Sequence, residues 1–221
     1  FAEACDYAHL RGASLYVAMN TIVLPEEMPR AVKLARQCLS SGADAFIVQD
    51  LGLAVALARQ LPDARLHAST QMSIHSKDGI SALADLGFAR VTLARELSLG
   101  EIESLCDHAA GLGLEVETFA HGALCVCYSG QCLMSSMIGG RSANRGLCAQ
   151  ACRLPYRLVD LRDEQRQLKS PGEHLLSPKD LCLVENVGDL ARVGVASLKI
   201  EGRMKSPEYA GTVVAVYREA V

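Results

Sequence analysis

The sequence lacks the short motifs that mark two common classes of hydrolase. It contains neither an H-E-x-x-H stretch, which supplies zinc ligands and a general base to many metalloproteases, nor a G-x-S-x-G nucleophile elbow. At its start it also lacks the basic segment, apolar stretch and small-residue cleavage site of a secretory signal. We therefore expect a cytoplasmic protein, in which clustered thiols serve metal or redox chemistry more often than disulfides.

Strong net charge is missing as well. The 221 residues carry a formal net charge of -3, so the whole chain gives no argument for binding nucleic acid. The charge is unevenly distributed, however, because the segment from Arg141 to Lys169 holds seven basic residues and three acidic ones, Glu164 among them. This local excess of +4 either contacts a polyanion or forms a solvated face.

Charged side chains are absent from residues 118–140, a stretch long enough to span a bilayer. His121, Ser129, Gln131 and several glycines nevertheless make it too polar for a lipid-facing helix. We therefore predict that this stretch builds a buried site and that the protein does not enter a membrane.

Short apolar runs alternate with helical patterns along most of the chain, which is typical of βαβ units and of a parallel sheet. The first five runs recur about every 25 residues, the repeat expected of a barrel built from strand-helix units. The predicted strands are residues 15–20, 45–50, 66–70, 90–94, 114–119 and 197–201, and the predicted helices are residues 26–40, 51–60, 77–86, 99–110 and 184–192.

Six predicted strands are two fewer than a closed barrel of this type needs. The chain begins at Phe1 inside a helical pattern that runs to Arg11, and it ends at Val221 inside another that starts at Pro207. We therefore expect the α/β class and an incomplete (β/α)8 TIM-like barrel that lacks about two N-terminal units, with an unpaired sheet edge.

A polar side chain follows every predicted strand. Because the carboxyl ends of parallel strands meet at one edge, where such barrels place their chemistry, these side chains are candidate site residues, although some will be helix caps. The candidates are Asn20, Gln49, Gln71, Arg95, His121, Glu201 and Arg203.

About 75 residues separate Gly122 from the last predicted strand, far more than a usual βα loop contains. A long insertion at the catalytic face normally has a function. The sequence thus predicts a partial β/α barrel in residues 1–121, a cysteine-rich metal-binding insertion in residues 122–182, and the last βα unit of the barrel in residues 183–221.

Four cysteines of this insertion form the strongest constellation. Six residues separate Cys125 from Cys132, fifteen separate Cys132 from Cys148, and three separate Cys148 from Cys152. Structural zinc sites favour two short pairs, and only the second pair qualifies. Iron-sulfur clusters accept irregular spacing, so we predict one metal centre and favour a cluster, with zinc as the alternative.

The other five cysteines receive different predictions. Cys5, Cys38 and Cys106 lie in helical patterns and are expected to be buried, inert thiols. Cys127 and Cys182 lie in the insertion, and either could replace Cys152 as the fourth ligand.

One segment of the insertion resembles the signature of peptidase family U32, the collagenase-like proteins. The resemblance extends over nearly the whole chain, through NTIV at Asn20, HASTQM at His67, RSANRG at Arg141 and SLKIEGRMKSPEY at Ser197, and it aligns the six strands with the last six of the family's barrel. The residues that match the signature are Glu117, Phe119, Gly122, Ala123, Leu124, Cys125, Gly130, Cys132, Met134 and Ser135.

This resemblance implies a function other than the family name suggests. Several members are implicated in oxygen-independent hydroxylation of a wobble uridine in tRNA, of a cytidine in rRNA, or of a ubiquinone precursor, with prephenate as cosubstrate and a [4Fe-4S] cluster held by four cysteines. The implied ligands here are Cys125, Cys132, Cys148 and Cys152. The segment RGLCAQACR at residues 145–153 is more similar to the RNA-modifying branch than to the quinone branch.

We therefore expect an RNA-modifying hydroxylase whose partners are tRNA or rRNA and a small dicarboxylate. Guanidinium groups bind carboxylates bidentately, and the basic segment would meet RNA phosphates while the target base leaves its stack. The expected catalytic residues are His121, Glu201 and Gln71, and the expected substrate-binding residues are Asn20, Gln49, Arg95, Arg141, Arg145 and Arg203.

Two other functions stay open at this point. A peptidase could pair Cys125 with His121, although a thiolate that ligates a cluster cannot also be a free nucleophile. A cluster-containing accessory protein of quinone hydroxylation would need no catalytic residues. The sequence leaves the particular RNA and the oligomeric state undetermined.

Overall fold

The computed structural model describes the backbone of residues 1–221 and all side chains except those of Glu164 and Gln165. Glu164, which enters the charge count above, thus has its side chain outside the described part. No helix within the described part is long and apolar enough to cross a membrane.

Six parallel strands form a curved sheet, which confirms the predicted partial barrel. Neighbouring strands pair in the order in which they occur along the chain, and β1 and β9 each pair on one side only within the described chain. The strands are β1 (Tyr16–Met19), β2 (Ala45–Val48), β3 (Leu66–Ala68), β4 (Phe88–Thr92), β5 (Glu115–Gly122) and β9 (Ser197–Glu201).

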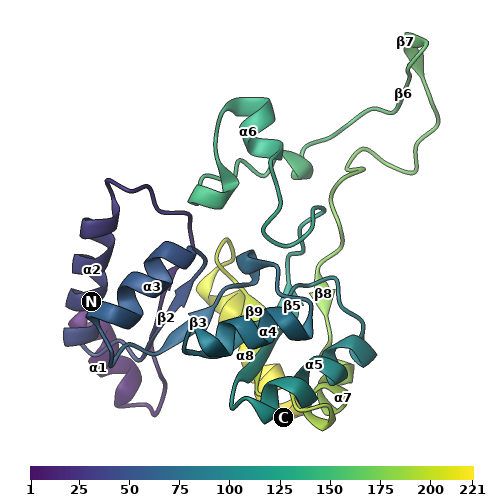
Figure 1. The fold of residues 1–221 in the computed structure, drawn as a ribbon. Helices are drawn as coiled ribbons and strands as arrows, with labels where there is room; N and C mark the ends of the chain where they lie inside the picture. Colours follow the sequence, from purple (N-terminus) through teal and green to yellow (C-terminus); the bar gives the residue numbers. More distant parts are fainter.

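Helices cover the convex face of this sheet (Figure 1). Phe46, Val48 and Val91 point outward from the strands and are fully buried against helical residues such as Leu53 and Leu57. The helices are α1 (Ala2–His9), α2 (Met28–Ser40), α3 (Leu51–Gln60), α4 (Lys77–Asp85), α5 (Leu99–Gly111), α7 (Val187–Arg192) and α8 (Pro207–Ala220).

Caps explain where several of these helices begin. The Asp50 carboxylate accepts a hydrogen bond from the Leu53 amide at 2.8 Å, and Ser98 forms a capping box with Glu101. Asp50, one of the polar residues after a strand, therefore has a structural role at the start of α3.

The insertion lies over the carboxyl edge of the sheet, and its hairpin extends away from the barrel (Figure 1). None of its elements was predicted, because each is too short to show a clear hydrophobic period. Strand β8 pairs antiparallel with the end of β5, opposite His121 and Gly122. The elements are α6 (Met134–Gly139), the 3-10 turns η2 (Ala143–Arg145) and η3 (Ala151–Arg153), the hairpin β6 (Val159–Asp160) and β7 (Asp163–Gln167), and β8 (Leu181–Cys182); two more 3-10 turns, η1 (Thr70–Met72) and η4 (Val184–Asn186), belong to the barrel.

Candidate functional site

Ser129 anchors the first loop of the insertion to the sheet edge. It is only 1% exposed, and its amide donates to the Glu96 carboxylate at 2.7 Å. Its hydroxyl oxygen accepts hydrogen bonds from the backbone N and the side-chain Nε of Arg95, at 3.2 and 3.1 Å. The loop that carries Cys125, Cys127 and Cys132 is thereby fixed above the end of β4.

Gly130 brings the same loop against η1. Its φ of +72° lies in the left-handed region, and a Cβ there would collide with the carbonyl group of Gln71. The hydroxyl of Ser73 also donates to the carbonyl oxygen of Ser129, and Gln131 Nε2 donates to Ser73 Oγ at 3.1 Å. Glycine is required here for both conformation and space.

A second contact fixes the far side of the insertion to the loop between β1 and α2. The Arg145 guanidinium donates two hydrogen bonds to the Glu27 carboxylate, at 2.7 and 3.0 Å, and a third to the carbonyl oxygen of Ile22. The Ile22 amide in turn donates to the carbonyl oxygen of Asn144. Arg145, predicted to bind substrate, has its guanidinium engaged in holding the insertion in place, and its substrate role stays a prediction.

Arg153 connects the two ends of the insertion. Its guanidinium donates to the Leu124 carbonyl oxygen at 2.6 Å, to Ser177 Oγ at 2.6 Å and to the Pro178 carbonyl oxygen at 2.9 Å. The loop before Cys125 and the segment leading into β8 are therefore joined next to Cys152. Sequence reasoning had placed Arg153 only among the basic residues of its segment and at the end of RGLCAQACR, and had assigned it no contact.

These contacts gather five cysteines above the sheet edge. Burial raises the pKa of Cys152, Arg153 opposes this, and Cys125, Cys148 and Cys132 are near enough to raise it further. Burial also raises the pKa of Cys127, as do a hydrogen bond with Cys132 and the proximity of Cys125.

The remaining cysteines lie elsewhere. Cys5, Cys38 and Cys106 are buried, as predicted, and burial raises the pKa of Cys106 to about 11. Cys182 is exposed on β8, near the Tyr217 hydroxyl. Cys127 thus stands nearer than Cys182 to the predicted ligand set.

The thiols of the insertion are soft donors, which zinc and iron-sulfur clusters both accept. Among the described side chains, no three His, Cys, Asp or Glu residues converge as ligands of a single metal ion. A cluster offers separate irons to separate cysteines, so its thiolates need to surround a larger volume than the tetrahedron around one zinc.

His121 does not face the other candidate residues. The pairing of β5 with β9 shifts between Phe119 and His121, and such a bulge re-aims the next side chain. The imidazole is directed at α8, where Nε2 shares a hydrogen bond of 3.0 Å with the Tyr209 hydroxyl and the ring meets Tyr217 edge-on. Nδ1 is buried without a partner in the described part, so neither nitrogen contacts the Cys125 thiol.

A charged network occupies the concave face of the sheet. Glu117 accepts hydrogen bonds from Lys199 at 3.2 Å, Ser197 at 2.8 Å and Thr92 at 2.8 Å, and Arg90 lies 3.8 Å away. Burial raises the pKa of Glu117, but Lys199 and the two hydroxyl donors outweigh burial, and the net pKa is lowered.

This network was missed as a functional cluster. Glu117 belongs to the family signature, and Lys199 belongs to the last quoted motif. Because the two residues lie on strands predicted to be parallel neighbours, their contact could have been predicted from the sequence. Nearby, His67 is 2% exposed, and burial and Arg90 lower its pKa to about 4.

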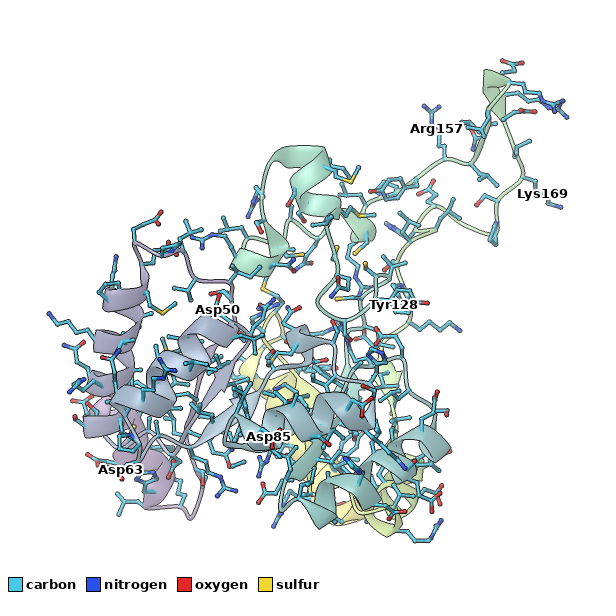
Figure 2. All side chains as sticks on the ribbon, viewed as in Figure 1. Asp50, Asp63, Asp85, Tyr128, Arg157 and Lys169 are labelled. Carbon is cyan, nitrogen blue, oxygen red and sulfur yellow. The ribbon has the colours of Figure 1, made fainter. Side chains whose placement is uncertain are left out.

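The other predicted residues do not form one compact site. The Gln49 side-chain oxygen is buried without a partner in the described part, whereas Glu201 accepts a hydrogen bond from the Arg203 amide. Asn20 and Gln71 are half-buried, and Arg141 and Arg203 are exposed. Figure 2 shows Tyr128 on the cysteine loop, with Arg157 and Lys169 on the hairpin arm away from the sheet.

Comparison with known proteins places this geometry in context. The sequence model described as Peptidase family U32 matches residues 1–221. The 23S rRNA 5-hydroxycytidine C2501 synthase of Escherichia coli (strain K12) is 45% identical over 218 residues, which cover 99% of this chain and 32% of that protein. The tRNA hydroxylation protein P1 of Bacillus subtilis (strain 168) is 36% identical over 224 residues, covering 100% of this chain and 52% of that protein.

The chain therefore spans about a third of the first relative and about half of the second. Among solved structures, the U32 peptidase Mk0906 matches with a TM-score of 0.54 and 16% sequence identity, over 93% of this chain and 76% of that chain. At this identity the likeness shows a shared fold, which agrees with the partial barrel.

Proposed function

Because the chain belongs to peptidase family U32, we propose that it acts in the oxygen-independent hydroxylation of a pyrimidine in RNA, with a [4Fe-4S] cluster and prephenate as cosubstrate. The observation that carries this proposal is the gathering of Cys125, Cys132, Cys148 and Cys152 above the strand ends. The 45% identity to an rRNA 5-hydroxycytidine synthase supports RNA as the substrate class.

In this proposal, residues 122–182 form the cluster-binding insertion between the partial barrel of residues 1–121 and the last βα unit of residues 183–221. The four cysteines would hold the cluster, and Cys127 is the alternative fourth ligand. When bound, such a cluster supplies one-electron chemistry. Arg153 would keep a positive charge beside the thiolates, which offsets part of their mutual repulsion.

The small dicarboxylate needs cations whose donors are free. Arg90 and Arg145 donate to carboxylates of the chain itself, whereas Arg95, among the described side chains, uses only its backbone N and Nε, on Ser129. Arg95 is therefore the proposed carboxylate ligand next to the cysteine loop, with Arg141 and Arg203 exposed and able to meet either the cosubstrate or RNA.

RNA would meet the exposed arm of the insertion. Arg157, Arg162 and Lys169 are exposed on or beside the β6–β7 hairpin, while Arg166 lies 3.7 Å from Asp160. Phosphate contacts of this kind position a nucleic acid without reading its sequence. A base directed to the strand ends would have to leave its stack.

The structure does not bring together Cys125 and His121, the two residues that the peptidase alternative would pair. Within the described part, Nε2 of His121 is bonded to Tyr209 on α8 and Nδ1 is buried without a partner, whereas the Cys125 thiol is gathered with other thiols. A nucleophilic thiolate needs a base within hydrogen-bond reach, which His121 does not provide.

The experiment that tests the function is mass spectrometry of RNA nucleosides. RNA from cells that lack the gene should lose one hydroxylated pyrimidine, and a gene copy with Cys125→Ser should fail to restore it. If the nucleosides of cells that lack the gene were identical to those of the parent cells, the proposal would be contradicted.

A further inference from the structure

A cavity of about 300 Å³ lies between the ends of β4 and β5, helices α5 and α7, and strand β8. Its walls are mostly apolar, with Leu99, Phe119 and Leu183 among them. Three polar side chains reach it, namely Arg95, Thr118 and Asn186. A largely apolar pocket with a few converging polar groups is the usual form of a small-molecule site, and this one is at the small end of the range.

The Thr118 hydroxyl gives the first indication of a ligand. The residue is 5% exposed, and its Oγ1 is buried without a hydrogen-bond partner in the described part of the chain. Buried polar groups are nearly always paired, because an unpaired one loses its hydration without compensation. A bound molecule with a hydroxyl or carbonyl group would satisfy this oxygen.

The charge of the cavity gives the second indication. The Arg95 guanidinium lies over the Phe119 ring, 5.6 Å from its centroid, and its Nε donates to Ser129. Within the described side chains its two terminal nitrogens carry no hydrogen bond or ion pair, and the cavity lining includes no carboxylate. Glu96 reaches Arg95 only through the Ser129 hydroxyl, so the site offers a cation with two free donors on one edge, which suits a carboxylate.

We propose that this cavity binds a small carboxylic acid with an apolar, ring-sized body. Its carboxylate would bind Arg95, its oxygen substituent would bond Thr118, and Asn186 would stand at the rim. The inference rests on the proposed function in one respect, since the acid that the hydroxylation consumes is the expected natural ligand. Ser129 joins Arg95 to the cysteine loop, so a filled site would also steady that loop.

Ligand-observed NMR and calorimetry on the anaerobically purified protein test the site, with phenylacetate as the probe and phenylacetamide as its neutral match. Phenylacetate should bind. The amide should bind at least about tenfold more weakly, because it cannot form the charge-assisted pair with Arg95. Equal binding of the two probes, or no binding of phenylacetate, would overturn the proposal.

Three variants locate the binding. Arg95→Gln should weaken phenylacetate binding about tenfold, Thr118→Val should weaken binding of 4-hydroxyphenylacetate, which carries an oxygen substituent, about tenfold but not that of phenylacetate, and Ala94→Leu, which fills the cavity, should abolish both. Thr212→Val makes the same chemical change on the exposed face of α8 and should leave binding unchanged. Thr118→Val should not lower the melting temperature of the free protein, because it removes an unpaired hydroxyl. A loss of binding in this variant would therefore not be due to misfolding.

The same preparations separate this proposal from the proposed function. Acid binding without any change in RNA nucleosides would support the cavity and contradict RNA hydroxylation. RNA hydroxylation that proceeds normally in Ala94→Leu would retain the function and overturn the cavity as its acid site.

Discussion

Gly130 lies directly against the carbonyl group of Gln71. The two are so close that a Cβ atom at position 130 would collide with this carbonyl group. The contact joins a loop residue of the cysteine-rich insertion to the turn that follows β3. The insertion is thus seated on the barrel at this point, and the position of the cysteines depends on it.

Replacing Gly130 by alanine should unseat the cysteine loop. The left-handed φ of +72° and the collision with Gln71 together should lower the free energy of unfolding by about 1–3 kcal/mol. Chemical denaturation measures this change, and the bound iron should fall with it. Gly139→Ala is the matched control, because a Cβ at Gly139 meets nothing within 4 Å; equal effects of the two variants would contradict the account.

Removing the charge of Glu117 should destabilise the concave face. Glu117→Gln leaves Lys199 without its partner in a largely buried position, and the expected loss is about 3 kcal/mol of unfolding free energy. Glu115→Gln is the control, because Glu115 is 38% exposed and its ion pairs should contribute below about 1 kcal/mol. A Glu117→Gln variant as stable as the parent protein would show that the network is dispensable.

The pair formed by Arg145 and Glu27 should be visible in a carboxyl titration. The hydrogen bonds from Arg145 lower the pKa of Glu27 to about 2 from 4.5. Since the pKa is depressed in the folded state, the stabilisation is fully present above pH 4.5 and is lost as the pH falls toward 2.

NMR titration of the Glu27 carboxyl carbon measures this value directly. Arg145→Gln should return the pKa of Glu27 toward 4.5 and loosen the segment around η2. A Glu27 titration that is unchanged in Arg145→Gln would mean that the two side chains are not paired in solution.

The hairpin arm should contribute to RNA affinity through phosphate contacts alone. Replacing Arg157 and Lys169 by alanine should reduce the slope of log affinity against log salt by about 1–2 and weaken binding to all RNA sequences alike. The control is Lys33→Ala with Arg36→Ala, which removes the same charges from the exposed face of α2. Identical salt slopes for the two double variants would remove the arm from the interface.

The barrel could be predicted because its strands and helices show their periods locally. Helix α3 begins and ends where predicted, and β9 has the predicted bounds. The short elements of the insertion follow from tertiary contacts, such as those of Ser129 and Arg153, and leave no such period.

The candidate site could be predicted only as a list of strand-end residues. Sequence position cannot show that a bulge after Phe119 directs His121 toward Tyr209, or that Glu27 engages Arg145 from more than a hundred positions away. The cysteine set is the part that spacing and resemblance predicted, and the approach of Cys125, Cys132, Cys148 and Cys152 supports it.

Iron and acid-labile sulfide, measured per chain after anaerobic purification, test the central claim most directly. The account predicts about four of each in the parent protein, loss of both in Cys125→Ser, Cys132→Ser and Cys148→Ser, and full retention in Cys182→Ser. A colourless protein that carries zinc, or a Cys182→Ser variant that loses its iron, would contradict a [4Fe-4S] cluster at the sheet edge.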